Sequence, residues 1–310
     1  MLVIVNPTAG AGRALGRWRR AAPRLRPYLP ACVTVETADP RHARLAVAAQ
    51  LARGETAFVA AGGDGTVNFV ATSIVESAPA ALLPRVTLGA IGLGSSNDFH
   101  KPFRHATRLD GIPCRLDFGH AVPHDVGVLA YEDERRIWRT RFWILNASVG
   151  ITAEANHAFN HPDAALRSLK RVLPSAGMAY AAIRGILTHR AADMTLACDD
   201  RPPGAARVRN LGIVKNPHFA GVLRYDSPYQ PNGGRFSAHL LEDVSLGGVA
   251  RTLIGLARGR FTGRRGTRSW RARRLALDAD RPFTVEVDGE TVTARRARFS
   301  VLPAALQVCA

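Results

Sequence analysis

The chain has 310 residues, of which 46% are hydrophobic and 22% charged, so it is long enough for two domains with sizeable cores. No apolar stretch approaches the roughly 18 residues that span a bilayer, and the first residues lack the basic lead of a signal peptide, so we expect a cytoplasmic protein. The formal net charge of +17 favours polyanionic partners, such as nucleic acid, anionic lipid headgroups or nucleotides, without choosing among them.

The first third of the chain alternates strand and helix patterns. Short apolar runs predict strands at residues 2–5, 33–35, 57–60 and 86–91. Helical patterns follow the first three runs, from residue 14, at about 41–52 and at 67 to about 76. This alternation predicts a doubly wound α/β domain over residues 1–120, with a parallel sheet covered on both faces. Glycine-containing loops follow several of the strands, and ligands bind such sheets at the carboxyl ends of the strands.

Beyond about residue 120 the pattern changes to short β-like runs. They lie at residues 142–145, 194–198, 211–214, 236–241, 275–277, 283–287 and 299–302. Helical stretches interrupt them at about 166–187 and 248–256. We therefore expect a C-terminal β-sandwich-like domain over residues 121–310, with the last strand able to return to the first domain. The cleft between the domains is the natural site for a substrate.

The string "VAAGGDGTVNFV" at residues 59–70 places three glycines around one acid. Gly62, Gly63 and Gly65 allow positive φ angles and remove Cβ atoms, so backbone N–H groups can turn toward a phosphate. We expect Thr66 to begin the next helix, whose N-terminus adds unpaired N–H donors. Asp64 would repel a phosphate unless it binds Mg²⁺ or accepts a proton from a hydroxyl, which are roles in phosphoryl transfer. The alternative is a tight strand-to-helix turn with a polar cap.

Two further strand-to-loop junctions have a similar composition. They are "IVNPTAG" at residues 4–10 and "AIGLGSSNDFHK" at residues 90–101. Neither the GxGxxG fingerprint nor the Walker GxxxxGK[ST] motif is present, which excludes the two commonest nucleotide-binding motifs.

Taken in order, "NPTAG", "GGDGT", "GSSNDF" and the "VDGE" at residues 287–290 resemble the diacylglycerol kinase catalytic-domain family of lipid kinases. This family includes soluble bacterial diacylglycerol kinases and sphingosine kinases. The resemblance covers nearly the whole chain; "GGDGT" alone is also similar to NAD kinases, whereas "NPxxG" and "NDF" are not. It implies an N-terminal nucleotide-binding domain, a C-terminal β-sandwich, ATP with Mg²⁺ as cofactors, and transfer of the γ-phosphate to a lipid hydroxyl in the interdomain cleft.

The resemblance also assigns site residues. The expected nucleotide-binding positions are Asn6, Pro7, Thr8, Gly10, Thr37, Gly62, Gly63, Asp64, Gly65, Thr66, Asn68, Ser95, Asn97 and Asp98. Asp64 and Asp98 are expected near the nucleotide-bound Mg²⁺. The catalytic candidates are Asp64, Asp288 and Glu290, with Glu290 preferred as the base for the lipid hydroxyl. Asp288 and Gly289 can also be interpreted as a two-residue hairpin turn.

Two departures from the family pattern matter. Phe69 stands where many relatives have a glutamate. The family's "NDGxxD" stretch, whose acids hold a structural Mg²⁺, is "NGGRFS" at residues 232–237, with Gly233 and Ser237 in place of acids and Arg235 between them. We therefore expect the structural metal loop at residues 227–237 to hold no divalent cation, because a hard cation needs oxygen ligands with compensating charge. Activity could be altered or lost as a result.

The resemblance implies a lipid substrate and peripheral association with an anionic membrane surface. We expect Phe261 and Trp270 to enter the headgroup region, beside arginines at positions 258, 260, 264, 265, 268, 271, 273 and 274. No helix-turn-helix or RNP1 motif is present, so we expect no nucleic-acid partner. The sequence leaves open whether the protein forms a homodimer. Two alternatives also remain: a kinase of the NAD kinase type with a soluble substrate, and a nucleotide- or lipid-binding relative without turnover.

Overall fold

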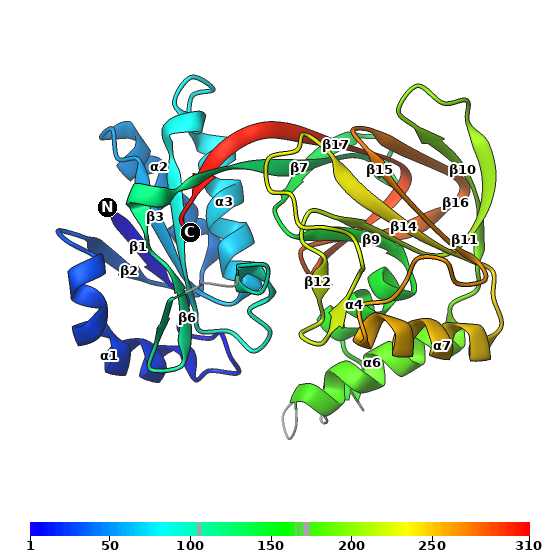
Figure 1. Cartoon of the computed structure of the whole chain (residues 1–310), viewed down its shortest axis with the longest axis horizontal. Coiled ribbons are helices and arrows are strands. Elements are labelled where there is room, and N and C mark those ends of the chain that lie inside the picture. The colour runs from blue at the N-terminus through cyan, green and yellow to red at the C-terminus, as the bar shows by residue number, and fades with distance from the viewer. Residues whose placement is uncertain (104–106, 165, 168, 170–173) are drawn as a thin grey trace.

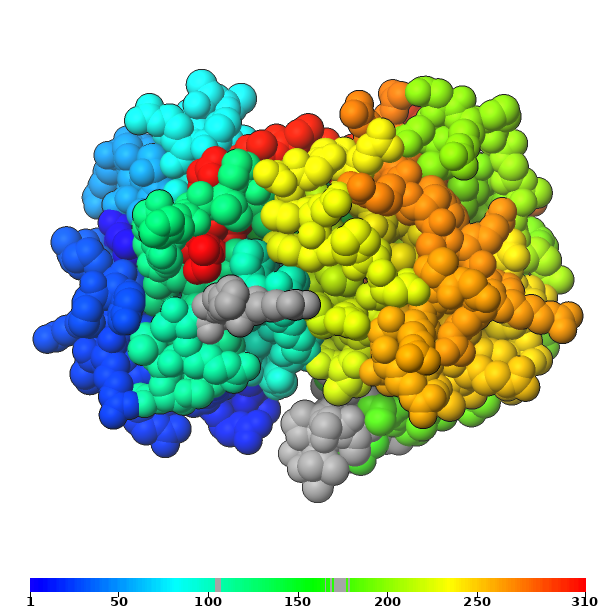
Figure 2. Space-filling model, in the orientation of Figure 1, coloured from blue at the N-terminus to red at the C-terminus, as the bar shows by residue number. Residues whose placement is uncertain are grey.

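The computed structural model describes residues 1–310 except 104–106, 165, 168 and 170–173 (Figure 1). Two domains lie side by side and are joined by two long strands. In the space-filling view, the yellow segment of the second domain abuts the cyan-to-green surface of the first (Figure 2). None of the described helices is both long and apolar enough to cross a bilayer.

The first domain is built on a parallel sheet with the strand order β4-β3-β1-β2. Its strands are β1 (Leu2–Val5), β2 (Val33–Glu36), β3 (Ala57–Gly62) and β4 (Thr87–Gly92), and its helices are α1 (Ala14–Leu25), α2 (Pro40–Ala52) and α3 (Asp64–Ser77). Leu2 and Ile4 pack against α2 and α3, whereas Val3 and Val5 pack against α1. Because successive strand residues point to opposite faces, this apolar run covers both faces of the sheet, as a doubly wound domain requires.

A hairpin of β5 (Thr107–Leu109) and β6 (Ile112–Arg115) extends this sheet, since β6 pairs with β4. The strands of the second domain are β7 (Val122–Glu132), β8 (Trp138–Trp143), β9 (Asn146–Gly150), β10 (Ala192–Cys198), β11 (Gly204–Val214), β14 (Phe236–Glu242), β15 (Thr267–Ala272), β16 (Leu275–Val287) and β17 (Glu290–Val308). A separate small hairpin contains β12 (His218–Phe219) and β13 (Leu223–Arg224). The helices are α4 (Ile151–Asn160), α6 (Pro174–Thr188) and α7 (Leu246–Ala257), and α6 and α7 lie along the lower edge of the domain (Figure 1).

Antiparallel pairing organises the second domain around one core. β11 pairs with β14 on one edge, and with β10 and then β9 on the other. Trp143, Phe236 and Phe299 are among the large side chains buried in this core. Gly127 must lack a side chain, because a Cβ there would lie 2.0 Å from the Trp143 ring. The predicted fold class, an α/β domain followed by a β-sandwich-like domain, is confirmed.

β7 and β17 form the antiparallel ribbon that joins the domains (Figure 1). β17 starts in the second domain, where it pairs with β16, and ends in the first, where Gln307 and Val308 pair with Thr87 and Leu88 of β4. Leu306 and Val308 are buried in the core of the first domain. The C-terminal strand is therefore part of both sheets.

Several predicted element boundaries are wrong. The helix after the glycine string begins at Asp64 and not at Thr66. The runs at 275–277 and 283–287 belong to one strand, β16, which continues through an irregularity in its pairing with β17. The strand predicted at 142–145 ends at Trp143. The next two backbone N–H groups donate to the Asp288 carboxylate, just after β16, and not to a neighbouring strand. Part of the helical stretch predicted at 166–187 lies outside the described residues, and α6 accounts for its second half.

Candidate active site

The loops that follow β1, β3 and β4 meet at the carboxyl end of the parallel sheet. The N–H of Asn6 donates to the carbonyl of Ala61 at 2.9 Å, and the N–H of Leu93 donates to the carbonyl of Gly62 at 2.7 Å. The side-chain amide of Asn6 lies 3.2 Å from Thr66 Oγ1. The three glycine-containing junctions of the sequence therefore lie together, as a parallel sheet requires.

Glycines in these loops permit close packing. Gly62, Gly63 and Gly65 do not use the positive φ angles that glycine allows, because the described residues with positive φ lie elsewhere. A Cβ on Gly62 would lie 2.2 Å from Thr66 Oγ1, and one on Gly94 would lie 2.4 Å from the Cα of Gly63. Gly65 faces open space. The contacts at Gly62 and Gly94 leave no room for a side chain, whereas the backbone at Gly65 stays accessible to a ligand.

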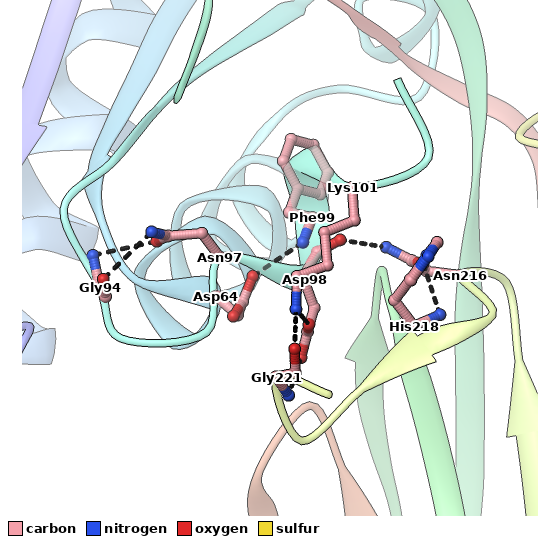
Figure 3. Close-up of polar contacts among 9 residues, drawn as sticks. All are labelled: Asp64, Gly94, Asn97, Asp98, Phe99, Lys101, Asn216, His218 and Gly221. Carbon is pink, nitrogen blue, oxygen red and sulfur yellow. Dashed lines mark hydrogen bonds and ion pairs between the residues drawn. The ribbon is translucent and has the colours of Figure 1, made fainter. Parts of the chain in front are cut away.

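Asp64 is the first residue of α3, with Gly63 as the N-cap. Its Oδ1 accepts a hydrogen bond from the N–H of Phe99 at 2.9 Å (Figure 3). Burial raises the pKa of Asp64 above its ordinary value of 3.8; the Phe99 N–H opposes this shift, and the charge of Asp98 adds to it. A carboxylate with a raised pKa is a stronger proton acceptor than an exposed one.

Asp98 links the first domain to the second. Its carboxylate pairs with Lys101 and accepts the N–H of Gly221 at 3.1 Å, and its carbonyl accepts the side-chain amide of Asn216 at 2.8 Å (Figure 3). Both carboxylate oxygens therefore have partners within the protein. Asn97 has a left-handed φ of 49°, and its side chain bonds the backbone of the glycine turn before it.

The other predicted nucleotide positions differ in their surroundings. The N–H and hydroxyl of Thr8 both donate to Asn6 Oδ1, and Pro7 lies between these two residues. The N–H of Thr37 donates to the last carbonyl of β1 at 2.9 Å. Asn68 accepts a long hydrogen bond, 3.4 Å, from a hydroxyl one turn later in α3. The loop residues thus lie at the carboxyl end of the sheet, whereas Asn68 is bonded within its own helix.

Two cavities of about 560 and 550 Å³ flank the loop after β4, and both include Arg17, Gly94 and Ser95. Gly10 lines the first of them. The basic side chains that line the two cavities are Arg13, Arg17, Arg20, Lys101 and Arg108. The sequence analysis missed them, although positions 13, 17 and 20 have the spacing of one helix face. They place positive charge where an anionic ligand would meet the N–H groups of the loops.

Another cavity, of about 290 Å³, lies between the domains and is lined mainly by apolar side chains. The first domain contributes Asp64, Ser96 and Asp98 to its lining. The apolar lining from the second domain includes Ile151, Ile186, Phe219, Val249, Leu253 and Leu256. Asp64 therefore belongs both to the glycine loops and to an apolar chamber.

Two carboxyl groups of the second domain also line this chamber. Asp288 accepts the N–H groups of residues 144–146 at 2.6 to 3.0 Å. Glu286 accepts the hydroxyl of Ser148 and the N–H of Gly289, each at 2.6 Å. Burial raises the pKa of both carboxyl groups to about 7, against these hydrogen bonds. The sequence analysis missed Glu286, because nothing in a strand pattern distinguishes a buried acid from an exposed one.

Glu290 is an exposed residue at the start of β17 and does not line the chamber. Asp288 and Gly289 have φ angles of 45° and 91°, so they form the two-residue hairpin turn that the sequence allowed as an alternative. Asp288 lines the chamber, as Asp64 does, and Glu290 lies outside it. A catalytic role for Glu290 stays a prediction.

Comparison with known proteins agrees with this arrangement. Residues 1–129 match the family described as "Diacylglycerol kinase catalytic domain", and residues 146–310 match the "YegS C-terminal NAD kinase beta sandwich-like domain". The chain is 28% identical to a Stenotrophomonas maltophilia protein named "Probable lipid kinase YegS-like", over 94% of this chain and 88% of that protein. It is 23% identical to a diacylglycerol kinase of Staphylococcus saprophyticus, over 75% of this chain and 69% of that one.

A crystal structure of a diacylglycerol kinase from Bacillus anthracis has the same fold, with a TM-score of 0.67, 14% identity, and coverage of 99% of this chain and 95% of that one. This likeness shows that the two domains share the fold of that protein. The chain belongs to the diacylglycerol kinase catalytic-domain family and carries the YegS-type second domain.

The close approach of the two glycine loops can be tested by adding one methyl group. We expect Gly94→Ala to destabilise the protein by about 1–3 kcal/mol or more, because its Cβ would overlap the backbone at Gly63. Gly65→Ala is the matched control; it lies in a helix with open space around it and should stabilise the fold by about 0.5–1 kcal/mol. Urea unfolding measures both changes, and equal stability of the two variants would contradict the packing argument.

The buried carboxyl group of Glu286 predicts a pH-dependent stability. Its pKa is raised from 4.5 to about 7, so its contribution to folding is complete below pH 4.5 and is lost as the pH rises through about 7. In Glu286→Gln the amide oxygen can still accept the N–H of Gly289 and the amide N–H can donate to Ser148 Oγ, and the side chain does not titrate. Across this interval the free energy of unfolding of the native protein should fall by up to about 3 kcal/mol relative to the variant. Urea titrations at several pH values check this, and parallel curves would contradict it.

Proposed function

We propose that this protein transfers the γ-phosphate of ATP to the hydroxyl of a diacylglycerol-like lipid. The observation that carries the proposal is the position of Asp64, which belongs to the glycine loops and also lines the apolar chamber. A phosphate donor in the loops and an acceptor hydroxyl in the chamber would meet at this carboxylate.

The nucleotide half of the proposal rests on charge and N–H donors. The first turn of α3 offers N–H groups at its N-terminus, and Arg13, Arg17 and Arg20 add positive charge beside the strand-end loops. A nucleotide-bound Mg²⁺ would take its ligands from phosphates and water, which leaves the Asp64 oxygen that does not bond Phe99 to accept a proton. When bound with the nucleotide, such an ion would neutralise charge on the phosphates. Asp98 serves instead to hold the turn against the second domain, because its oxygens bond Lys101 and Gly221.

The acceptor half rests on the chamber between the domains. Apolar helices α4, α6 and α7 line it, and the carboxyl groups of Glu286 and Asp288 are occupied by bonds within the protein. A soluble dinucleotide acceptor, as in an NAD kinase, would need many polar partners for its sugar and phosphate groups, whereas these walls are mainly apolar. Acyl chains need only apolar walls, so the chamber favours the lipid.

Within this proposal each residue has a limited role. The loops orient the γ-phosphate, the chamber excludes water around the acceptor, and Asp64 accepts the proton of the attacking hydroxyl. The pKa of Asp64 is raised by burial, so activity should be lost on the acid side at a higher pH than an exposed aspartate would give.

The proton acceptor can be identified by two isosteric substitutions. Asp64→Asn should lower turnover by about a hundredfold or more, whereas Glu290→Gln should stay near the native rate because Glu290 lies outside the chamber. Radiolabelled phosphate transfer from ATP to lipids in mixed micelles measures turnover, and calorimetry controls for nucleotide binding. The opposite result, a loss of turnover in Glu290→Gln and not in Asp64→Asn, would identify Glu290 as the base, as the sequence motif favours.

We also propose that the protein docks on anionic membranes, but not through Phe261. That side chain is 2% exposed and packs edge-on against Tyr225 and His239, so the expectation that it enters the headgroup region is wrong. Several arginines of the basic segment also bond within the protein: Arg264 donates to two carbonyl groups and Arg268 pairs with Glu242.

The helices under the chamber offer better contacts for a membrane. Ile183 and Leu187 of α6 and Leu246 and Ile254 of α7 are each about half exposed or more. The exposed Arg251 lies on α7, and Arg258 is the residue directly after this helix. Apolar side chains flanked by arginines on the helices that line the lipid chamber would bring the lipid and the chamber together.

Sedimentation with vesicles tests the membrane proposal. Ile183→Ser combined with Ile254→Ser should weaken binding to vesicles of any charge, whereas Arg251→Ser combined with Arg258→Ser should weaken binding to anionic vesicles only, and mainly at low salt. Leu45→Ser, an exposed change on α2 of the first domain, is the matched control. Native binding in all the variants would remove this face from the proposal.

A further inference from the structure

A buried ion pair lies beneath the loop between β13 and β14. The Nζ of Lys215, the residue after β11, is 2.6 Å from Oδ2 of Asp125 in β7, and both side chains are fully buried. Such a pair is costly to bury unless the remaining donors and acceptors of both groups also have partners. The surroundings of the pair therefore decide what it does.

The ammonium group has an acceptor for each of its three donors. Besides Asp125, Nζ donates to the carbonyl of Gln230 at 3.0 Å and to the carbonyl of Arg235 at 2.9 Å. The carboxylate also accepts the N–H of Gly234 at 2.8 Å and the N–H of Ala304 at 2.9 Å. The loop at residues 230–235 is thus folded around one positive charge and its counter-ion.

The oxygen atoms around Lys215 are of the kind that bind metal ions, but the ammonium group already occupies the space where an ion would lie. One carboxylate and two carbonyl oxygens are ligands that a hard divalent cation prefers, and here they bond the ammonium of Lys215. Gly233 and Ser237 add no carboxylate, and a Cβ on Gly233 would lie 3.1 Å from the guanidinium of Arg271. The residues of the 227–237 loop therefore do not fit the structural Mg²⁺ that the family resemblance implies.

The same strand end reaches the candidate active site. Asn216, which follows Lys215, donates its side-chain amide to the carbonyl of Asp98 at 2.8 Å. The backbone N–H groups of both residues donate to the carbonyl of Leu145 at 2.9 Å. The position of the ammonium and the position of the Asp98 turn are thus set by neighbouring residues of one chain segment.

We propose that the ammonium of Lys215 takes the place of a structural divalent cation, so that the 227–237 loop and the Asp98 turn are held without metal. Burial lowers the pKa of Lys215 below 10.5, and the hydrogen bond and charge of Asp125 oppose that shift. The inference concerns how the fold is held and does not depend on the proposed lipid kinase activity.

The first test uses the native protein, without nucleotide or lipid. Purified protein treated with EDTA should keep its Tm, adding Mg²⁺ or Ca²⁺ should not raise it, and elemental analysis should find far less than one divalent ion per chain. A fall in Tm with EDTA that Mg²⁺ or Ca²⁺ reverses, or a bound divalent ion at one per chain, would overturn the inference.

The second test removes the charge. Lys215→Met keeps the apolar stem but leaves Asp125 buried and unpaired, so we expect a loss of Tm on the order of 10 °C and faster hydrogen exchange at the Gly234 amide. Arg268→Met, which breaks the exposed pair with Glu242, is the matched control and should change Tm by less than about 2 °C.

A double variant tests the same point if Lys215→Met does not fold. Lys215→Met combined with Asp125→Asn removes both charges and should recover part of the lost stability, since no buried charge is left unpaired. A native Tm in Lys215→Met, or a double variant less stable than Lys215→Met, would show that the ammonium does not hold the loop.

Discussion

The turn at residues 97–99 is the contact on which the arrangement of the two domains depends. Its backbone N–H at Phe99 is held by Asp64 of the first domain, and Asp98 is bonded by Asn216 and Gly221 of the second (Figure 3). These groups are backbone atoms, two carboxylates and one side-chain amide, and together with the β7–β17 ribbon they hold one domain against the other. The chamber lies where the polar loops of one domain face the apolar helices of the other.

Two kinds of surface therefore meet at one carboxylate. On the side of the sheet, N–H groups and arginines suit an anion, and on the side of the helices the walls suit hydrocarbon. Water is a poor competitor in such a place, because the apolar walls bind it weakly and a bound anion would occupy the donors. The separation of charged and apolar walls, and not any one residue, is what suits the site to joining a phosphate donor with a lipid.

The sequence predicted the first domain well because its strands are continuous apolar runs and its loops carry glycine. The motifs also located Asp64 and the Asp98 turn. What they could not show is contact between distant segments. Glu286 occupies an ordinary strand position, and only its bonds to Ser148 and Gly289 make it a buried acid. Phe261 lies in an arginine-rich stretch that indicates exposure, yet aromatic side chains from other segments cover it. No sequence motif pointed to Lys215.

The path of β17 has a consequence for how this protein is made. The sheet of the first domain includes Gln307 and Val308, the strand end beside β4, and its core includes Leu306. A ribosome that has released only the first domain has therefore delivered a sheet with one edge strand missing and an apolar core open on that side. Folding of the N-terminal domain cannot finish until residues 306–308 have been made, so the edge of β4 at Thr87 and Leu88 stays unpaired, a site for chaperones or misassembly, while the second domain is synthesised.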